Sequence, residues 1–308
     1  MKKLSLVISV YNEEAVLEKF YKAFCSIEQD LKYGGYELIF VNDGSTDASM
    51  RILESIAQQN KNVRVISFSR NFGHEAAMIA GIDHAVGDVI ICMDADLQHP
   101  LECITPIMEK FEEGYEIVSM VRTSNKSAGA IKNFTSRAFY RVINALSDQV
   151  KLEENASDFF AISSRVADVL RTNYREKTRF LRGYVQSVGF RKTTLEYTAA
   201  ERAGGASHYT LKKLMNFAIS TIVDFSDFPL KLGLYAGAVS FLAAVLFAIS
   251  ALCGFREYKV ILAAVNVLFA VLFLLVGIMG EYFSVAFAEL KNRPIYIVEK
   301  EINSGHCV

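Results

Sequence analysis

The sequence predicts an α/β domain followed by two membrane-spanning helices. Short apolar runs alternate with amphipathic runs between Leu4 and Val121, and the stretches 233–255 and 260–280 contain no charged residue. Strands that alternate with helices are typical of a parallel sheet covered on both faces. About 20 apolar residues in a helix are enough to cross the hydrocarbon core of a bilayer. The net charge of −1 argues against a nucleic-acid partner.

The individual elements follow from the same alternation. We expect strands at 4–10, 36–41, 63–68, 89–93 and 117–121, and helices at about 14–31, 48–59, 74–85 and 101–111. In the first helix one apolar stripe is formed by Val16, Leu17, Phe20, Phe24, Ile27 and Leu31. Ligands of such sheets bind at the carboxyl ends of the strands, so the candidate chemistry should lie there.

The stretch 89–100 ends in two acids that are spaced two residues apart. Because strand side chains alternate between faces, Asp94 and Asp96 should point to one side and Ala95 to the other. Two carboxylates can hold Mg²⁺ or Mn²⁺, which takes oxygen ligands and normally completes its shell with substrate phosphate oxygens. Gln98 could add a third oxygen. An acidic surface loop is the alternative.

Polar residues also follow the second and third strands. Asp43, at a strand tip, is placed to accept hydrogen bonds from a nucleobase or ribose, and Asp47 is placed to cap the next helix. Arg70 follows the third strand, where either a substrate phosphate or an internal carboxylate could be its partner. The sequence leaves both possibilities open.

The charges around the apolar stretches predict the orientation of a membrane hairpin. Basic residues flank it on both sides, at Lys212, Lys213, Lys231, Lys291, Arg293 and Lys300, against Arg256 and Lys259 in the short connection. The positive-inside rule therefore places both large flanks in the cytoplasm. We expect an α/β domain at 1–210, an amphipathic interfacial helix at 211–229, two spans within 230–285 and a cytoplasmic tail at 286–308. Packing of 211–229 against the sheet is the alternative.

The motifs at the four strand ends together resemble a known family. They are Val10-Tyr-Asn-Glu-Glu14, Asn42-Asp-Gly-Ser-Thr-Asp47, Ser69-Arg-Asn-Phe-Gly73 and Met93-Asp-Ala-Asp-Leu-Gln98. Further matching segments are Ser157-Asp158-Phe159, the run from Arg202 to Tyr209, Gly280-Glu-Tyr282 and Arg293-Pro-Ile-Tyr296. In this order they resemble family 2 glycosyltransferases of the GT-A fold. The most similar group is the polyprenyl-phosphate glycosyltransferases, which include dolichol-phosphate mannose synthase and bactoprenol glucosyltransferase.

Four positions depart from the family pattern. Ser9 replaces a usual Pro, His99 a common Asp, Phe160 a frequent Arg and His208 a frequent Lys. None of these removes a presumed metal ligand, but the last two lie in segments expected near the sugar or acceptor.

The resemblance implies a hexosyltransferase that transfers a sugar from a nucleoside diphosphate, with UDP-glucose as the expected donor, to undecaprenyl or another polyprenyl phosphate, with inversion. It assigns nucleotide-sugar binding to Tyr11, Glu13, Asp43, Arg70, Asp94 and Arg202. Asp96 and Asp158 would be catalytic, and Asp158 could be the base or could orient the acceptor or pair with an Arg. The acceptor phosphate would be bound by Arg122, Lys132, Ser136, Arg137 and His208. For Lys132 and Arg137 the alternative is a solvated basic face of a helix.

The resemblance also implies the setting of the enzyme. We expect a multi-pass protein of the cytoplasmic membrane, a homo-oligomer such as the tetramer of relatives, and contact with a lipid-linked sugar flippase. A processive polysaccharide synthase is disfavoured, since the chain has no Trp for the Gln-x-x-Arg-Trp motif. UDP-N-acetylglucosamine, GDP-mannose or an aminosugar donor, and an inactive nucleotide-binding scaffold, stay open.

Overall fold

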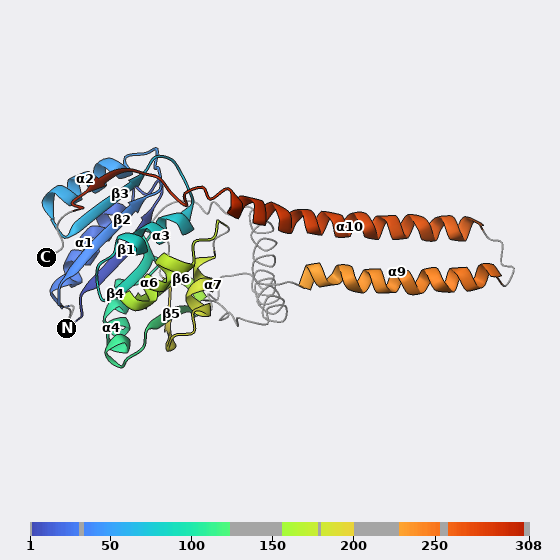
Figure 1. The fold of residues 1–308 in the computed structure, drawn as a ribbon. Helices are drawn as coiled ribbons and strands as arrows, with labels where there is room; N and C mark the ends of the chain where they lie inside the picture. Colours follow the sequence, from blue (N-terminus) through green and yellow to red (C-terminus); the bar gives the residue numbers. More distant parts are fainter. Residues whose placement is uncertain are drawn as a thin grey trace. The chain divides into compact units, whose positions relative to one another are not determined.

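A computed structural model describes residues 2–30, 34–123, 156–177, 180–199, 228–252 and 258–304 (Figure 1). The chain divides into two compact units. The first comprises 1–141, 150–210 and 294–308, and the second comprises 142–149 and 211–293. Each unit is treated by itself below.

The first unit is built on a central sheet that, in the described residues, has eight strands in the order β7-β5-β6-β4-β1-β2-β3-β8. The strands are β1 (Leu4–Val10), β2 (Tyr36–Asn42), β3 (Val63–Phe68), β4 (Val89–Asp94), β5 (Ile117–Arg122), β6 (Ala156–Ser163), β7 (Lys192–Tyr197) and β8 (Val298–Ile302). The five strands expected from sequence are confirmed. The expectation of a parallel sheet was wrong in part, because β6 and β8 run antiparallel to their neighbours.

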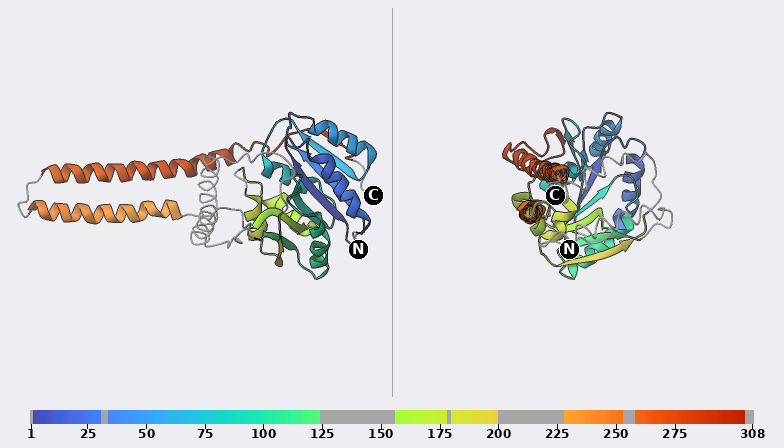
Figure 2. Two further views of the ribbon diagram at one scale, coloured as in Figure 1. Left: turned by 180° about the vertical axis from the view of Figure 1, so that it is seen from behind. Right: turned by 90° about the vertical axis from the view of Figure 1, so that its right-hand side faces the viewer.

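Helices cover both faces of this sheet, and Figure 2 shows the ribbon from two further sides. They are α1 (Leu17–Ile27), the short η1 (Glu28–Asp30), α2 (Ser49–Gln59), α3 (His74–His84), η2 (Leu101–Cys103), α4 (Ile104–Glu112), α6 (Ser164–Asn173) and α7 (Leu181–Ser187). Helix α1 begins three residues later than expected. The amides of Glu13 and Glu14 instead donate to Ser49 and Asp47 in the next loop.

The two faces of β1 pack against different helices. Its residues Leu4, Leu6, Ile8 and Val10 belong to one core with apolar side chains of α1, α2 and α4. On the other face α3 lies close to Val7, since a Cβ on Gly81 would come 2.1 Å from Val7 Cγ1. Because His74 contacts Ser9 and the chain after α3 contacts Ser5, α3 runs antiparallel to β1. The first turn of α3 therefore lies at the carboxyl end of the parallel strands.

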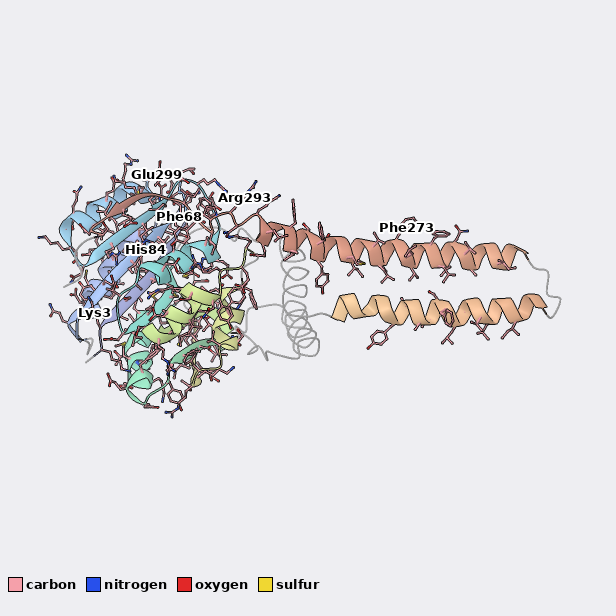
Figure 3. All side chains as sticks on the ribbon, in the orientation of Figure 1. Lys3, Phe68, His84, Phe273, Arg293 and Glu299 are labelled. Atoms are coloured by element: carbon pink, nitrogen blue, oxygen red, sulfur yellow. The ribbon has the colours of Figure 1, made fainter. Side chains whose placement is uncertain are left out.

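The C-terminal segment of the chain returns to the sheet. Strand β8 pairs with β3, the Tyr296 ring stacks on Phe68 at 5.1 Å, and the Tyr296 hydroxyl donates to Asp83 at 2.8 Å. Figure 3 labels Phe68, His84 and Glu299 in this region. The boundaries expected from sequence stay predictions, but part of the expected tail is an edge strand of the sheet.

The second unit contains two long helices, α9 (Phe228–Leu252) and α10 (Tyr258–Leu290), which lie side by side (Figures 1 and 2). Gly233 of α9 faces Leu275 of α10, since a Cβ there would lie 3.7 Å from Leu275 Cδ2. Within the part of the chain that is described, one segment, Ala264–Leu290, meets the length and hydropathy needed to cross a membrane, with a mean hydropathy of 2.2. Phe273 in this segment, labelled in Figure 3, is 70% exposed.

Candidate active site

The loops that follow β1 and β2 are joined by hydrogen bonds. The Asn12 amide donates to Ser45 Oγ at 2.9 Å, and the Thr46 amide donates to Asn12 Oδ1 at 2.8 Å. Asp47 was expected to be the N-cap of α2, but the N-cap is Ala48. Asp47, one residue earlier, accepts the amide of Ser49 at the start of the helix. Tyr11, expected to bind the nucleotide sugar, is exposed beside these loops. Glu13 is held at its amide by Ser49.

Asp43 fixes the loop that follows β3. Its carboxylate is buried and accepts the amides of Phe72 at 2.6 Å and Gly73 at 2.9 Å. Gly44 has a φ of +65°, and a Cβ there would lie 2.4 Å from the Arg70 carbonyl carbon, so glycine is required. Nucleobase binding by Asp43 stays a prediction. In the structure its carboxylate holds the loop after β3 in place.

Arg70 lies exposed on the same loop. Its guanidinium lies 4.1 Å from the centre of the Phe72 ring and donates to the Asn71 carbonyl. Among the described residues it is not held by an internal carboxylate in any ion pair. The guanidinium is therefore open to solvent, as a phosphate ligand would need.

The predicted metal ligands follow one another at the end of β4. Asp96 is 5% exposed, and its Oδ1 accepts the Gln98 amide at 3.0 Å across a turn in which Leu97 has a φ of +60°. Gln98 Oε1 accepts a hydrogen bond from Arg122 at 3.4 Å. Arg122 Nε is buried and has no hydrogen-bond partner among the described residues. Arg122 can thus serve an anion that reaches this strand end.

The donor chemistry at this strand end fits a divalent ion only in part. Among the residues that the structure describes, no three His, Cys, Asp or Glu side chains form a group able to hold a metal. Asp94 and Asp96 supply two hard oxygen ligands, and Mg²⁺ is commonly bound by one or two carboxylates together with substrate phosphates. The residues therefore fit an ion that binds together with a diphosphate.

Asp158 lies at an irregularity of β6. Ser119 pairs with Phe160 and Val121 with Ala156, so β6 has three residues where β5 has one. Ser157 stabilises this bulge, since its hydroxyl donates to the Met120 carbonyl and accepts the Phe159 amide. Bulges re-aim side chains and are common beside active sites.

His74, in the first turn of α3, lies between the carboxylates of Asp94 and Asp158. Its Nδ1 is 3.0 Å from Ser9 Oγ and 3.6 Å from Asp94 Oδ1, and its Nε2 is 4.0 Å from Asp158 Oδ2. Burial lowers the pKa of His74, but the charges of Asp94 and Asp158 more than offset this and raise it above its ordinary value. A cationic imidazole is therefore favoured between two acids.

Asp158 also faces a guanidinium, because Arg182 Nε of α7 lies 3.6 Å from its Oδ1. Burial raises the pKa of Asp158, but Arg182 and then His74 bring it below the ordinary carboxyl value. The neighbouring Glu75 accepts the Leu181 amide at 3.0 Å, and burial together with the Asp158 charge raises its pKa to about 7. Asp158 is thus an ionised carboxylate held by cations near neutral pH.

Sequence reasoning missed three residues of this site. His74 directly follows the matched segment Ser69–Gly73, but it received no role. His99 was noted only as a departure from the family pattern, and its Nδ1 accepts the Asp94 amide at 3.1 Å. Burial lowers the pKa of His99 below its ordinary value. Arg182 carried no signal, since α7 was not expected.

Several predicted site residues lie outside the described part of the chain. These are Lys132, Ser136, Arg137, Arg202 and His208. Their assignments to the acceptor phosphate and to the nucleotide sugar stay predictions. The structure brings together Asp94, Asp96, Gln98, Arg122 and Asp158.

Comparison with solved structures gives moderate similarity. Glucosyl-3-phosphoglycerate synthase from Mycobacterium tuberculosis, solved with Mn²⁺, UDP and glucosyl-3-phosphoglycerate, is 18% identical, with a TM-score of 0.49 over 72% of this chain and 78% of that chain. A Staphylococcus aureus TarS fragment is 16% identical, with a TM-score of 0.45 over 64% and 59% of the two chains.

Relatives in sequence match almost the whole chain. An uncharacterised glycosyltransferase of Bacillus subtilis is 38% identical, over 96% of this chain and 93% of that protein. A prophage-derived bactoprenol glucosyl transferase of Shigella flexneri is 37% identical, over 97% and 98% of the two chains. Residues 5–171 match the family described as glycosyl transferase family 2. The chain belongs to this family and is a glycosyltransferase.

Proposed function

We propose that this enzyme transfers glucose from UDP-glucose to undecaprenyl or a similar polyprenyl phosphate, with inversion at the anomeric carbon. The observation that carries the proposal is the relationship to the Shigella flexneri bactoprenol glucosyl transferase, which extends over 97% of this chain and includes both long apolar helices. The carboxylates and cations at the carboxyl end of the sheet supply a site suited to two anionic substrates.

Asp94, Asp96 and Gln98 would hold Mg²⁺ or Mn²⁺. A divalent ion bound there neutralises the charge that develops on the nucleoside diphosphate as the glycosidic bond breaks. Asp96 is almost fully buried and Asp94 is hydrogen-bonded to Ser9, so both carboxylates are held in place before substrate arrives. This arrangement supports tight binding of the diphosphate at the end of β4.

The acceptor needs little activation, because a phosphate monoester has a second pKa of about 6 and is largely ionised near neutral pH. A general base works best with a pKa near the operating pH, whereas that of Asp158 is lowered by Arg182 and His74. We therefore assign Asp158 the role of orienting the acceptor and the cations around it. Arg122, with its buried and unpartnered Nε, would bind the acceptor phosphate. Lys132, Ser136, Arg137 and His208 would assist.

The lipid acceptor confines the reaction to a membrane. We propose that α10 crosses the cytoplasmic membrane, that α9, which is 25 residues long, forms a second span beside it, and that the first unit is cytoplasmic. Assembly as a homo-oligomer and contact with a flippase remain part of this proposal.

The test is a donor panel with the full-length protein in vesicles that contain undecaprenyl phosphate. UDP-glucose, UDP-N-acetylglucosamine, GDP-mannose and an aminosugar nucleotide are supplied singly, and the lipid product is identified by its mass. We expect a hexose adduct with UDP-glucose that depends on the lipid. If the adduct forms only with another donor, glucose is excluded as the transferred sugar. If no donor gives an adduct, the proposed reaction is excluded.

A further inference from the structure

The pairing between β4 and β6 ends just before the two strands reach their acids. The last pairs are Ile91 with Ala161 and Cys92 with Phe160. Two residues further in the same register, Asp94 would lie directly opposite Asp158. Like charges directly opposite each other across a strand pair are destabilising. The pairing instead ends at Cys92 and Phe160, and one side chain contacts both strands beyond this point.

That side chain is His99, on the turn that follows β4. It is 6% exposed, and its Nδ1 accepts the Asp94 amide at 3.1 Å. Its ring stacks on Phe159 with centres 4.9 Å apart and planes at 22°. Tyr197 of β7 packs edge-on against both rings, at 5.8 Å from His99 and 5.4 Å from Phe159. The His99 imidazole thus contacts Asp94 itself and Phe159, which is the neighbour of Asp158.

The two contacts need different properties of the ring. The hydrogen bond requires Nδ1 to be an unprotonated acceptor, so the neutral imidazole carries its proton on Nε2. The stack requires only a flat ring of this size. Phenylalanine could fill the same space between Phe159 and Tyr197, but it would leave the Asp94 amide without its acceptor.

We infer that His99 is a positioning residue that sets the geometry of Asp94 through the hydrogen bond and that of Asp158 through the stack on Phe159. The inference rests on the proposed function, in which Asp94 binds the metal and Asp158 orients the acceptor. Residues that support metal ligands through hydrogen bonds commonly change metal affinity or activity by about 10- to 100-fold when they are replaced. Two substitutions separate the two contacts.

The first substitution is His99→Phe, which keeps the ring and removes the acceptor. The second is His99→Asn, whose side-chain oxygen can take the place of Nδ1 but which has no ring. Both are made in the full-length protein. Free Mn²⁺ is followed by electron paramagnetic resonance during titration in the presence of UDP, and turnover is measured at saturating Mn²⁺.

We expect His99→Phe to raise the apparent Kd for Mn²⁺ by about tenfold or more, with kcat at saturating metal largely retained. We expect His99→Asn to keep the Mn²⁺ affinity of the wild type and to lower kcat by about tenfold. His84→Asn serves as the matched control, because His84 contacts Glu301 and the Ala80 carbonyl at the other end of α3. It should leave both quantities unchanged.

The outcomes are distinguishable. A wild-type enzyme without metal-dependent transfer contradicts the proposed function, whatever the variants do. With an active wild type, equal effects of the two variants on both quantities, or no effect of either, would overturn the inference and leave His99 as ordinary core packing. If one variant does not fold, the other still tests its own contact against the wild type.

Discussion

The two ends of helix α3 carry polar clusters that differ in the length of their contacts and in their exposure. At the amino end of the parallel strands, Glu37 accepts Ser5 Oγ at 2.5 Å, the Val86 amide at 2.8 Å and Arg64 at 3.0 Å. Ser5 in turn accepts the Gly87 amide at 2.8 Å. Apart from Arg64 Nε, the described polar groups of this cluster are hydrogen-bonded to one another, and the side chains of Ser5, Glu37 and Arg64 are buried.

At the carboxyl end the contacts are longer and the groups more exposed. His74 is 3.6 Å from Asp94 and 4.0 Å from Asp158, Arg182 is 3.6 Å from Asp158, and the His74 and Asp158 side chains are about one third exposed. Ser9 takes the place on β1 that Ser5 has at the other end, on the same face of the strand. Here the charged groups face one another at ion-pair distances.

We expect this difference to separate a cluster that stabilises the fold from one that can bind ligands. A closed buried network rigidifies the structure, and removing one member leaves the others unsatisfied at a cost in stability. Partly exposed groups at ion-pair distances contribute less to stability, and a phosphate or a metal can reach them. Substitutions at the two ends of α3 should therefore affect different measurements.

The largest effect is expected for Asp96→Ala at the carboxyl end. Loss of this buried carboxylate should reduce transfer by about 10²- to 10³-fold, because charge on the leaving diphosphate is no longer offset, while the thermal unfolding transition changes little. Chelation of the wild-type protein should have the same effect and should be reversed by added Mg²⁺ or Mn²⁺. Near-normal turnover of the variant would remove Asp96 from the metal site.

The second prediction concerns the amino end. Glu37→Met leaves the Arg64 guanidinium buried without its carboxylate, and breaking a buried ion pair from one side costs about 3–5 kcal/mol in the free energy of unfolding. The double variant with Arg64→Met should recover much of this loss, as measured by denaturant unfolding. Transfer per folded molecule should stay close to wild type in both. A specific loss of activity would show that this cluster is not purely structural.

The third prediction asks what Asp158 does within the open cluster. If Asp158 orients the acceptor, Asp158→Asn should lower transfer by about 100-fold through misplacement of the acceptor and should regain part of the rate as pH rises through the acceptor's second pKa of about 6. An obligatory base predicts an inactive variant at every pH. A pH profile of the variant on undecaprenyl phosphate distinguishes the two.

Local sequence signals were sufficient to locate the strand end that carries the predicted metal ligands. The apolar run predicts a strand at 89–93, and β4 ends one residue later, at Asp94. Asp96 lies in the turn that follows, and its placement on the same side as Asp94 stays a prediction. The hydrogen bonds that Asp43 accepts from the loop after β3, and the stack of His99 on Phe159, join residues that are far apart in the chain. Their geometry follows from strand pairing, which no local pattern reveals.

Two of the three missed strands, β7 and β8, have a physical explanation. Strand β8 is Val298-Glu-Lys-Glu-Ile302, an edge strand with three exposed charged residues, so it lacks the apolar run that marked the central strands. Strand β7 alternates exposed and half-buried residues at the opposite edge of the sheet. Edge strands bury little surface, and their sequences therefore resemble loops.

The smallest effects come from a matched pair of substitutions on β1, Ser5→Ala and Ser9→Ala, which remove the same hydroxyl from the two clusters. Ser5→Ala leaves the buried Gly87 amide unsatisfied and should cost about 1–3 kcal/mol of stability without changing the apparent metal affinity. Ser9→Ala removes the donor to Asp94 and should weaken Mn²⁺ binding in the presence of UDP by about tenfold or less, with little change in unfolding.

Each variant is the control for the other, because the substitution, the strand and the face of the sheet are the same. Denaturant unfolding and Mn²⁺ titration are measured on both proteins. If Ser9→Ala destabilises the fold as much as Ser5→Ala and leaves Mn²⁺ binding unchanged, the carboxyl-end cluster is structural. The longer contacts around His74 would then have no bearing on ligand binding.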